Sequence, residues 1–135
     1  YSIYTFHSAY FSGGMFGVYA AVAPENLDRT LEITFEEMRS LRDVPMKDEE
    51  LDINREHLKG SMLMSLEGTF NRMSRMAKSM MYYNRLLTID EVIEGVDAVA
   101  AKDVQTLCAE IFQQDTSALV VLGPTSDFHL KELPL

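Results

Sequence analysis

Four side chains of this 135-residue chain are of the nitrogen and sulfur types that bind zinc, namely His7, His57, His129 and Cys108. No two histidines stand three or four positions apart, and there is neither an HxxEH motif nor a cysteine pair. Glu56 precedes His57, but neighbouring helical residues point about 100° apart and cannot chelate one ion. The sequence therefore predicts no zinc site. His57 is expected on a solvated helix face, His7 in strand packing and His129 in a tail.

Nucleophilic side chains are present without the motifs that activate them. Ser12, Ser61 and Ser65 lie outside any GxSxG elbow, and no glycine-rich phosphate loop follows a strand. The lone Cys108 permits no internal disulfide and falls on the apolar face of an expected helix, with no histidine near it in sequence. We interpret it as a small buried hydrophobe, which also fits a reducing compartment. The residues by themselves thus supply no complete active site.

Methionine is concentrated in one part of the chain. Six of the nine methionines lie between residues 47 and 86, namely Met62, Met64, Met73, Met76, Met80 and Met81. Flexible methionine side chains can form an adaptable peptide-binding surface. Several of them share one helical stripe, however, so the favoured interpretation is that most fill a core.

The charge balance narrows the range of partners. The formal net charge is −9 and the pI about 4.7. Such a chain would repel nucleic-acid phosphates and anionic lipid rather than neutralise them. No apolar run has the length of a membrane span. We therefore expect neither a nucleic acid nor a membrane as partner, whereas basic peptides remain compatible with the acidic surface.

The elements that must position any site begin with a β-hairpin over residues 1–23. Residues 1–10 alternate in strand fashion, "FSGG" (Phe11 to Gly14) supplies the turn, and residues 15–23 form an apolar strand expected to be covered on both faces. Gly17 indicates a bulge or a close approach of another backbone.

Helices dominate the rest of the chain. A helix is predicted over 24–42, with Pro24 at its start, and a long helix over 47–86, broken near Gly68. Two short helices follow over 88–114, the first opened by a Thr88–Glu91 capping box. A buried strand over 116–123 and a tail over 124–135 complete the chain.

This order of elements predicts an α+β fold, with an antiparallel sheet and helices packed mainly on one of its faces. The length suits one domain. Three strands are few for so much helix, and Tyr1 already stands inside a strand-like run. We therefore expect further sheet partners outside the chain and a truncation at its N-terminus.

Three stretches in order carry a family resemblance: "YSIYTFHSAYFSGGMFGVYAAVAPENLDRTLEI", "EELDINREHLKGSMLMSLEGTFNRM" and "VDAVAAKDVQTLCAEIF…ALVVLGP". Over about residues 1–124 the chain resembles the C-terminal half of pitrilysin/insulinase-type zinc metallopeptidases, in the branch similar to mitochondrial processing peptidase. Ala100 and Lys47 depart from the pattern, because the family often has a capping Thr or Ser there.

The resemblance implies that residues 1–135 are the C-terminal part of the non-zinc-binding peptidase domain, truncated at the N-terminus. It implies that the HxxEH motif and its zinc belong to an N-terminal half, so that this chain alone is not catalytic. Tyr1 matches the last residue of the family pattern R-E-x-x-G-L-A-Y. Its hydroxyl would then contact the scissile carbonyl in the transition state, paired with an arginine upstream of the chain.

The partners implied are the N-terminal catalytic half, an extended peptide or presequence as substrate, and a homo- or heterodimer. Two alternatives stay open: a non-catalytic partner or core subunit of the same family, and a free-standing peptide-binding module. The expected location is the cytoplasm of a bacterium, and the mitochondrial matrix and the periplasm are also compatible.

Overall fold

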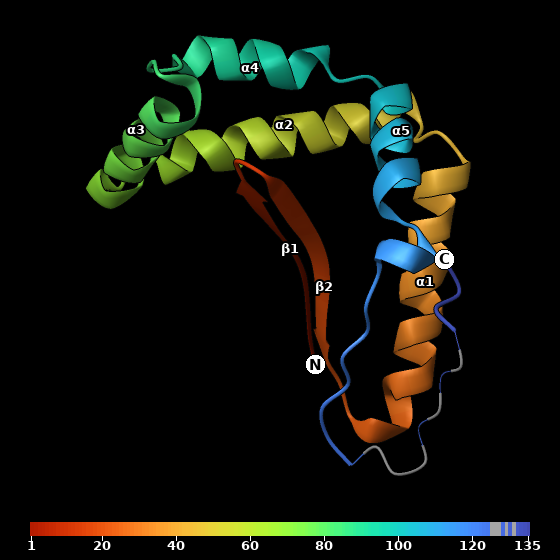
Figure 1. Ribbon diagram of the computed structural model, residues 1–135. Helices are drawn as coiled ribbons and strands as arrows, with labels where there is room; N and C mark the ends of the chain where they lie inside the picture. Colours follow the sequence, from red (N-terminus) through yellow and green to blue (C-terminus); the bar gives the residue numbers. More distant parts are fainter. Residues whose placement is uncertain (125–127, 129, 131) are drawn as a thin grey trace. The chain divides into compact units, whose positions relative to one another are not determined.

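The computed structural model describes residues 1–124, 128, 130 and 132–135. They form two strands, five α-helices and two short 3₁₀ helices (Figure 1). The chain divides into two compact units, one formed by Tyr1–Pro45 with Gln105–Leu135 and the other by Met46–Val104. The two-stranded antiparallel sheet and the helices confirm the α+β class, while the packing of helices on one face of the sheet stays a prediction.

The hairpin of the first unit consists of β1 (Ser2–Tyr10) and β2 (Gly13–Ala21). Pairing runs without interruption from Ser2 opposite Ala21 to Tyr10 opposite Gly13, so the predicted hairpin is confirmed and Gly17 makes no bulge. The expectation that the second strand is covered on both faces was wrong. Most residues of β2 are exposed, because no further strand or helix encloses both of its faces within the described residues.

After the hairpin, a 3₁₀ turn (Pro24–Asn26) leads into α1 (Leu27–Asp43), which confirms the helix predicted over 24–42. Proline fits the first position because its missing N–H would have no helical partner there. Phe35 is buried and Met38 is partly buried, so the predicted apolar stripe faces inward. The Arg39 guanidinium donates a hydrogen bond to the carbonyl of Pro134, which ties the C-terminal end to α1 (Figure 1).

The predicted strand over 116–123 was wrong. A 3₁₀ turn (Gln114–Thr116) is followed by residues without regular structure as far as Leu122. Val120 is 89% exposed and Leu122 is 99% exposed. An apolar, β-branched sequence forms a strand only where a neighbouring strand accepts its backbone hydrogen bonds. The only sheet among the described residues is β1–β2, and this segment does not join it. The predicted tail lies partly outside the described residues.

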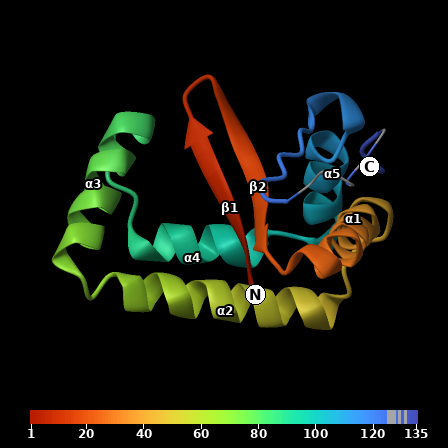
Figure 2. The same cartoon turned by 90° about the horizontal axis from the view of Figure 1, so that it is seen from below.

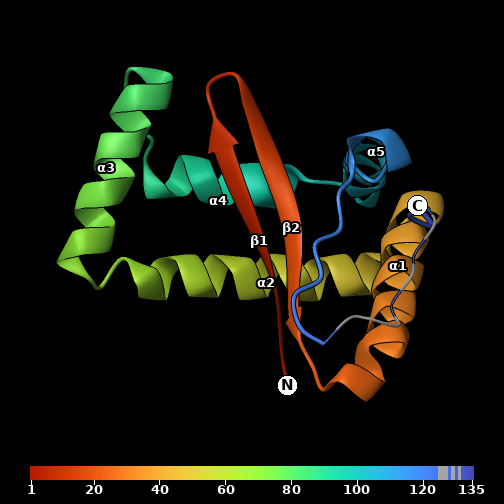
Figure 3. The ribbon, with the colours of Figure 1, turned by 60° about the horizontal axis from the view of Figure 1, so that its bottom comes forward.

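The second unit contains α2 (Asp48–Ser65), α3 (Thr69–Tyr83) and α4 (Ile89–Ala98). The long helical stretch is broken between Ser65 and Thr69, which confirms the break predicted near Gly68. The Asn71 side-chain amide donates to the Ser65 carbonyl at 3.0 Å and braces this break. Figures 2 and 3 show α4 lying alongside α2, with α3 connecting them at one end.

The predicted capping box at α4 is confirmed. Thr88 Oγ1 accepts the Glu91 backbone N–H at 3.1 Å, and Glu91 Oε2 accepts the Thr88 N–H at 2.8 Å. The next helix, α5 (Ala101–Ile111), follows Ala100, where a capping hydroxyl is missing. The Asp103 carboxylate nevertheless accepts the Ala100 N–H at 2.8 Å. One half of a capping box is thus kept without the threonine.

Few side chains are buried: Phe35, Leu51, Leu66, Cys108 and Phe112 are the buried apolar residues among those described. The expectation that most methionines fill a core was wrong, since Met64, Met73, Met76, Met80 and Met81 are exposed. A helical stripe predicts which residues share a face, but burial also requires a second layer. None of the helices formed by the described residues has the length and apolar character that a bilayer crossing requires.

Candidate functional site

Tyr1 stands immediately before β1, next to the Ser2–Ala21 pair that ends the hairpin ladder. Its side chain is fully exposed. The hairpin therefore presents this phenol to solvent, where a ligand could reach it. The catalytic contact assigned to Tyr1 by the resemblance stays a prediction.

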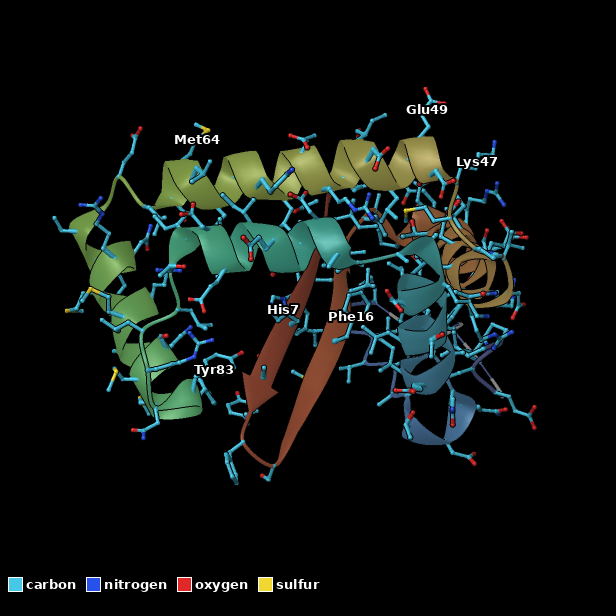
Figure 4. All side chains as sticks on the ribbon, turned by 90° about the horizontal axis from the view of Figure 1, so that it is seen from above. His7, Phe16, Lys47, Glu49, Met64 and Tyr83 are labelled. Atoms are coloured by element: carbon cyan, nitrogen blue, oxygen red, sulfur yellow. The ribbon has the colours of Figure 1, made fainter. Side chains whose placement is uncertain are left out.

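The hairpin has two faces because successive strand residues point to opposite sides. His7 pairs with Phe16 on one face, and Figure 4 labels the two on neighbouring strands. The Phe16 ring packs against Phe112, with centroids 5.6 Å apart and planes tilted by 54°. This face is therefore covered at Phe16 by the segment that follows α5.

The opposite face carries four aromatic residues, Tyr4, Phe6, Tyr10 and Tyr19. We call the three whose rings contact one another, Tyr4, Phe6 and Tyr19, the aromatic face. Tyr4 and Tyr19 pair across the strands and stack, with centroids 4.9 Å apart and planes 25° apart. The ring centroid of Phe6 lies 6.4 Å from that of Tyr4. The Phe6 ring also covers Gly17, the residue opposite it on β2. Sequence reasoning missed this cluster, because two-residue spacing alone does not say which residues of the partner strand lie opposite.

The histidines do not assemble a site. His7 belongs to β1, His57 lies exposed on α2, and His129 lies outside the described residues. The carboxylate of Glu56, the residue before His57, forms an ion pair with Lys59 at 2.6 Å. In the part of the chain that the structure describes, no group of three or more His, Cys, Asp or Glu side chains could hold a metal ion.

Cys108 is buried on α5, which confirms its interpretation as a small apolar residue. Burial raises the pKa of its thiol. Because the thiolate is the reactive form, the raised pKa makes this side chain a poor nucleophile at neutral pH.

Of the three serines considered as nucleophiles, Ser65 donates its hydroxyl to the Met62 carbonyl at 2.7 Å, and Ser12 and Ser61 are exposed. Sequence reasoning overlooked a fourth, Ser79, which is the buried polar residue among those described. Its hydroxyl donates to the Arg85 carbonyl at 2.6 Å and accepts the Leu87 N–H at 2.8 Å. Ser79 thus braces the turn between α3 and α4.

Charged side chains link α2 to the end of α4. The Lys59 ammonium donates to the Asp97 carboxylate at 2.7 Å, and its hydrogen bonds to Asp97 and Glu56 raise its pKa. Arg55 pairs with Asp52 at 2.6 Å and donates to the Val99 carbonyl. A cation near the last carbonyls of a helix is favourable. These contacts are structural rather than catalytic.

The first turn of α2 is acidic as predicted, with Asp48, Glu49 and Glu50 near the positive end of the helix dipole. Figure 4 shows the side chains of Lys47 and Glu49 at this helix end. Lys47 makes no capping hydrogen bond through its side chain.

The exposed methionines of α3 form an open groove of about 600 Å³. Met73, Met76 and Met80 line it together with Leu86 of the following turn, and Arg72 is its charged lining residue. This geometry is compatible with the adaptable peptide-binding surface that the sequence left as an alternative. Met64 also points away from α2, at 73% exposure (Figure 4).

Comparison with known proteins adds what the residues alone do not show. Residues 1–58 match a family model described as the peptidase M16 inactive domain. The chain is 32% identical over 127 residues to the uncharacterized zinc protease YmxG of Bacillus subtilis, covering 94% of this chain and 31% of YmxG. It is 31% identical over 124 residues to the mitochondrial-processing peptidase subunit beta of Blastocladiella emersonii, covering 91% of this chain and 26% of that subunit.

A third relative is the uncharacterized zinc protease SCO5738 of Streptomyces coelicolor, 28% identical over 127 residues, which cover 94% of this chain and 28% of the relative. The matches define a domain of the zinc-peptidase class. The chain belongs to the pitrilysin-type peptidase family, M16, and to its C-terminal domain. The predicted family is thereby confirmed. The chain spans about a third of the length of the curated relatives it matches, or somewhat less.

Proposed function

We propose that this chain is the chamber-forming and substrate-binding part of a zinc-dependent peptidase that cleaves extended peptides or presequences. The observation that carries the proposal is the match over more than nine-tenths of the chain to relatives named zinc proteases and processing peptidase. The matching domain is described as inactive, which fits a role in substrate binding rather than metal binding.

Zinc would be held in another part of the full-length protein. The described residues of this chain offer no cluster that fits the ion. In such a peptidase zinc supplies Lewis acidity to the attacking water and to the scissile carbonyl. The partner proposed for this chain is therefore an N-terminal catalytic half, with a dimer as a further possibility since one relative is a named subunit.

Tyr1 is the residue of this chain proposed to act in the chemistry. Its exposed phenol would donate a hydrogen bond to the carbonyl oxygen of the bond being cleaved. That oxygen gains negative charge as the tetrahedral intermediate forms, so the hydrogen bond strengthens in the transition state. An arginine upstream would hold the extended substrate beside it.

A peptide-hydrolysis assay of the full-length protein tests this proposal. We expect cleavage of an extended peptide, loss of cleavage on chelation, and recovery when zinc is returned. An inert full-length protein at every zinc concentration would contradict the proposal.

A second candidate function is motivated by a relative that is named as one subunit of a peptidase, which allows a partner role for the full-length protein. The full-length protein would then be a non-catalytic partner or core subunit of the same family. The two candidates differ in the coding sequence upstream of this chain. An intact HxxEH motif there supports the peptidase, and its absence supports the non-catalytic subunit.

A further inference from the structure

We propose that the groove on α3 lined by Met73, Met76, Met80 and Leu86, which we call the methionine groove, is covered by the part of the full-length polypeptide outside these 135 residues. The covering segment is apolar and carries an acidic side chain opposite Arg72. The inference goes beyond the proposed function, because it concerns the assembly of the protein and holds equally for a peptidase and for a non-catalytic subunit.

Helix α3 makes its contacts within the second unit through polar side chains. Asn71, Arg75 and Ser79 stand four residues apart and therefore share one face of the helix. Asn71 braces the break after α2, Arg75 donates to the Leu87 carbonyl at 2.9 Å, and Ser79 braces the turn before α4. This inward face is thus satisfied by hydrogen bonds.

The methionines of the groove lie on a different face of the same helix. Met73, Met76 and Met80 follow one another at intervals of three and four residues and form one stripe. Their side chains are 59%, 50% and 48% exposed, and no other described helix of the unit runs alongside α3 (Figures 2 and 3). A surface helix normally turns its apolar stripe towards a core. Among the described residues α3 does the reverse, so its stripe lacks a covering layer.

The length of the relatives indicates what supplies that layer. The chain covers 31% of YmxG and 28% of SCO5738, so most of such a polypeptide lies outside these 135 residues. A segment joined to α3 by the same backbone is present at a high effective concentration. Globular proteins rarely leave a contiguous apolar stripe in water. Intramolecular packing is therefore the occupant that these observations favour.

Charge selects the kind of segment that fits. Residues 68–89 contain four basic side chains and no Asp or Glu, in a chain with a formal net charge of −9. Arg75 donates to backbone carbonyls, and Arg85 pairs with Glu91 at 2.6 Å. The Arg72 guanidinium lines the groove and has no hydrogen bond or ion pair with another described residue. A carboxylate on the covering segment would be its partner, since covering an unpaired charge is costly.

Methionine oxidation in the full-length protein tests the inference. Dilute hydrogen peroxide converts exposed methionines to sulfoxides, and peptide mass spectrometry gives the rate at each position. Met73, Met76 and Met80 should react at least about tenfold more slowly in the native protein than in denaturant, because the covering segment must open first. Met64, which is 73% exposed on α2, is the control and should react readily in both states. Equal native and denatured rates at the three groove positions overturn the inference.

Dilution and added peptide separate the other occupants. Protection by the protein's own polypeptide does not depend on protein concentration. Protection that disappears on dilution would assign the groove to a second copy of the protein. Protection that appears only when an apolar peptide is added would make the groove a peptide-binding surface. Either result overturns the inference.

Matched substitutions in the full-length protein locate the covered surface. Met80→Glu should raise the oxidation rates of Met73 and Met76 about tenfold, because it places an unpaired carboxylate under the covering segment. The control is Met81→Glu, the same substitution at the next residue, which is 80% exposed and lies outside the groove lining. Equal effects of the two substitutions would contradict the groove as the covered surface.

Charge reversal tests the acidic side chain of the covering segment. Arg72→Glu should raise the oxidation rates in the groove, whereas Lys78→Glu, on the same helix but outside the groove lining, should not. Unchanged protection in Arg72→Glu would contradict the proposed carboxylate partner.

Discussion

Phe6 of β1 and Gly17 of β2 are paired across the hairpin, and the Phe6 ring occupies the space above Gly17 that a side chain would need. The glycine at residue 17 of β2 therefore allows the aromatic ring of Phe6 on β1 to occupy its observed position. It also stabilises a strand at a glycine, which by itself packs poorly. Neither residue shows this relationship without the register of the strands.

Gly17→Ala should displace the Phe6 ring, whereas Gly13→Ala should not. No heavy atom outside the immediate chain neighbours lies within 4 Å of a Cβ built at Gly13. Upfield-shifted resonances over the Phe6 ring measure the displacement by proton NMR. An unchanged ring environment in Gly17→Ala would show that the ring does not depend on the glycine.

Thr88→Ala should destabilise α4 by about 1 kcal/mol, because it removes the hydroxyl that accepts the Glu91 N–H. Lys47→Ala is the matched control at the start of α2, where the side chain makes no capping bond. Urea unfolding followed by circular dichroism compares the two variants. Equal stability losses in both would argue against the capping box as a stabilising feature.

Glu91 should remain ionised to low pH. Its pKa is lowered to about 2, first by the backbone N–H of Thr88 and then by the Arg85 guanidinium. Because the folded-state pKa lies below the ordinary value of 4.5, the stabilisation is present above about pH 4.5 and is lost as the pH falls towards 2. Side-chain carbon NMR during an acid titration measures this pKa directly.

Arg85→Ala should move the pKa of Glu91 up towards its ordinary value, since it removes the ion pair at 2.6 Å. The backbone contribution from Thr88 should persist in that variant. A titration curve identical to that of the parent chain would show that the ion pair is not formed in solution.

Cys108 should react with iodoacetamide far more slowly in the folded chain than in denaturant. It is 7% exposed, and burial raises the pKa of its thiol. Because it is the only cysteine, mass spectrometry of the intact chain reports its modification without ambiguity. Rapid labelling of the folded chain at neutral pH would place this side chain at the surface instead.

Tyr1→Phe in the full-length protein should lower kcat by about two orders of magnitude and change KM little. The phenol is proposed to donate a hydrogen bond that strengthens in the transition state, and loss of one such donor typically costs this much. Tyr10→Phe, at another exposed tyrosine of the hairpin, is the control. An unchanged kcat in Tyr1→Phe would contradict the catalytic contact proposed for this residue.

Local patterns in the sequence determined most of the secondary structure. The alternation of residues 2–10, the glycines of the turn and the Thr88–Glu91 box each act through contacts between near neighbours. The apolar stripe around Phe35 likewise predicted the inward face of α1. The family resemblance was also present in the sequence, and the catalytic contact proposed for Tyr1 comes from that resemblance, since no local contact in the hairpin indicates it.

Only the tertiary structure decided which apolar segments find a partner. The segment around Val120 has strand-forming residues but no strand beside it, and the methionines of α3 form a stripe without a covering layer among the described residues. The register of β1 and β2 likewise brought Tyr4 against Tyr19 and Phe6 over Gly17. Periodicity specifies which side chains share a face, whereas burial and pairing depend on what lies opposite that face in space.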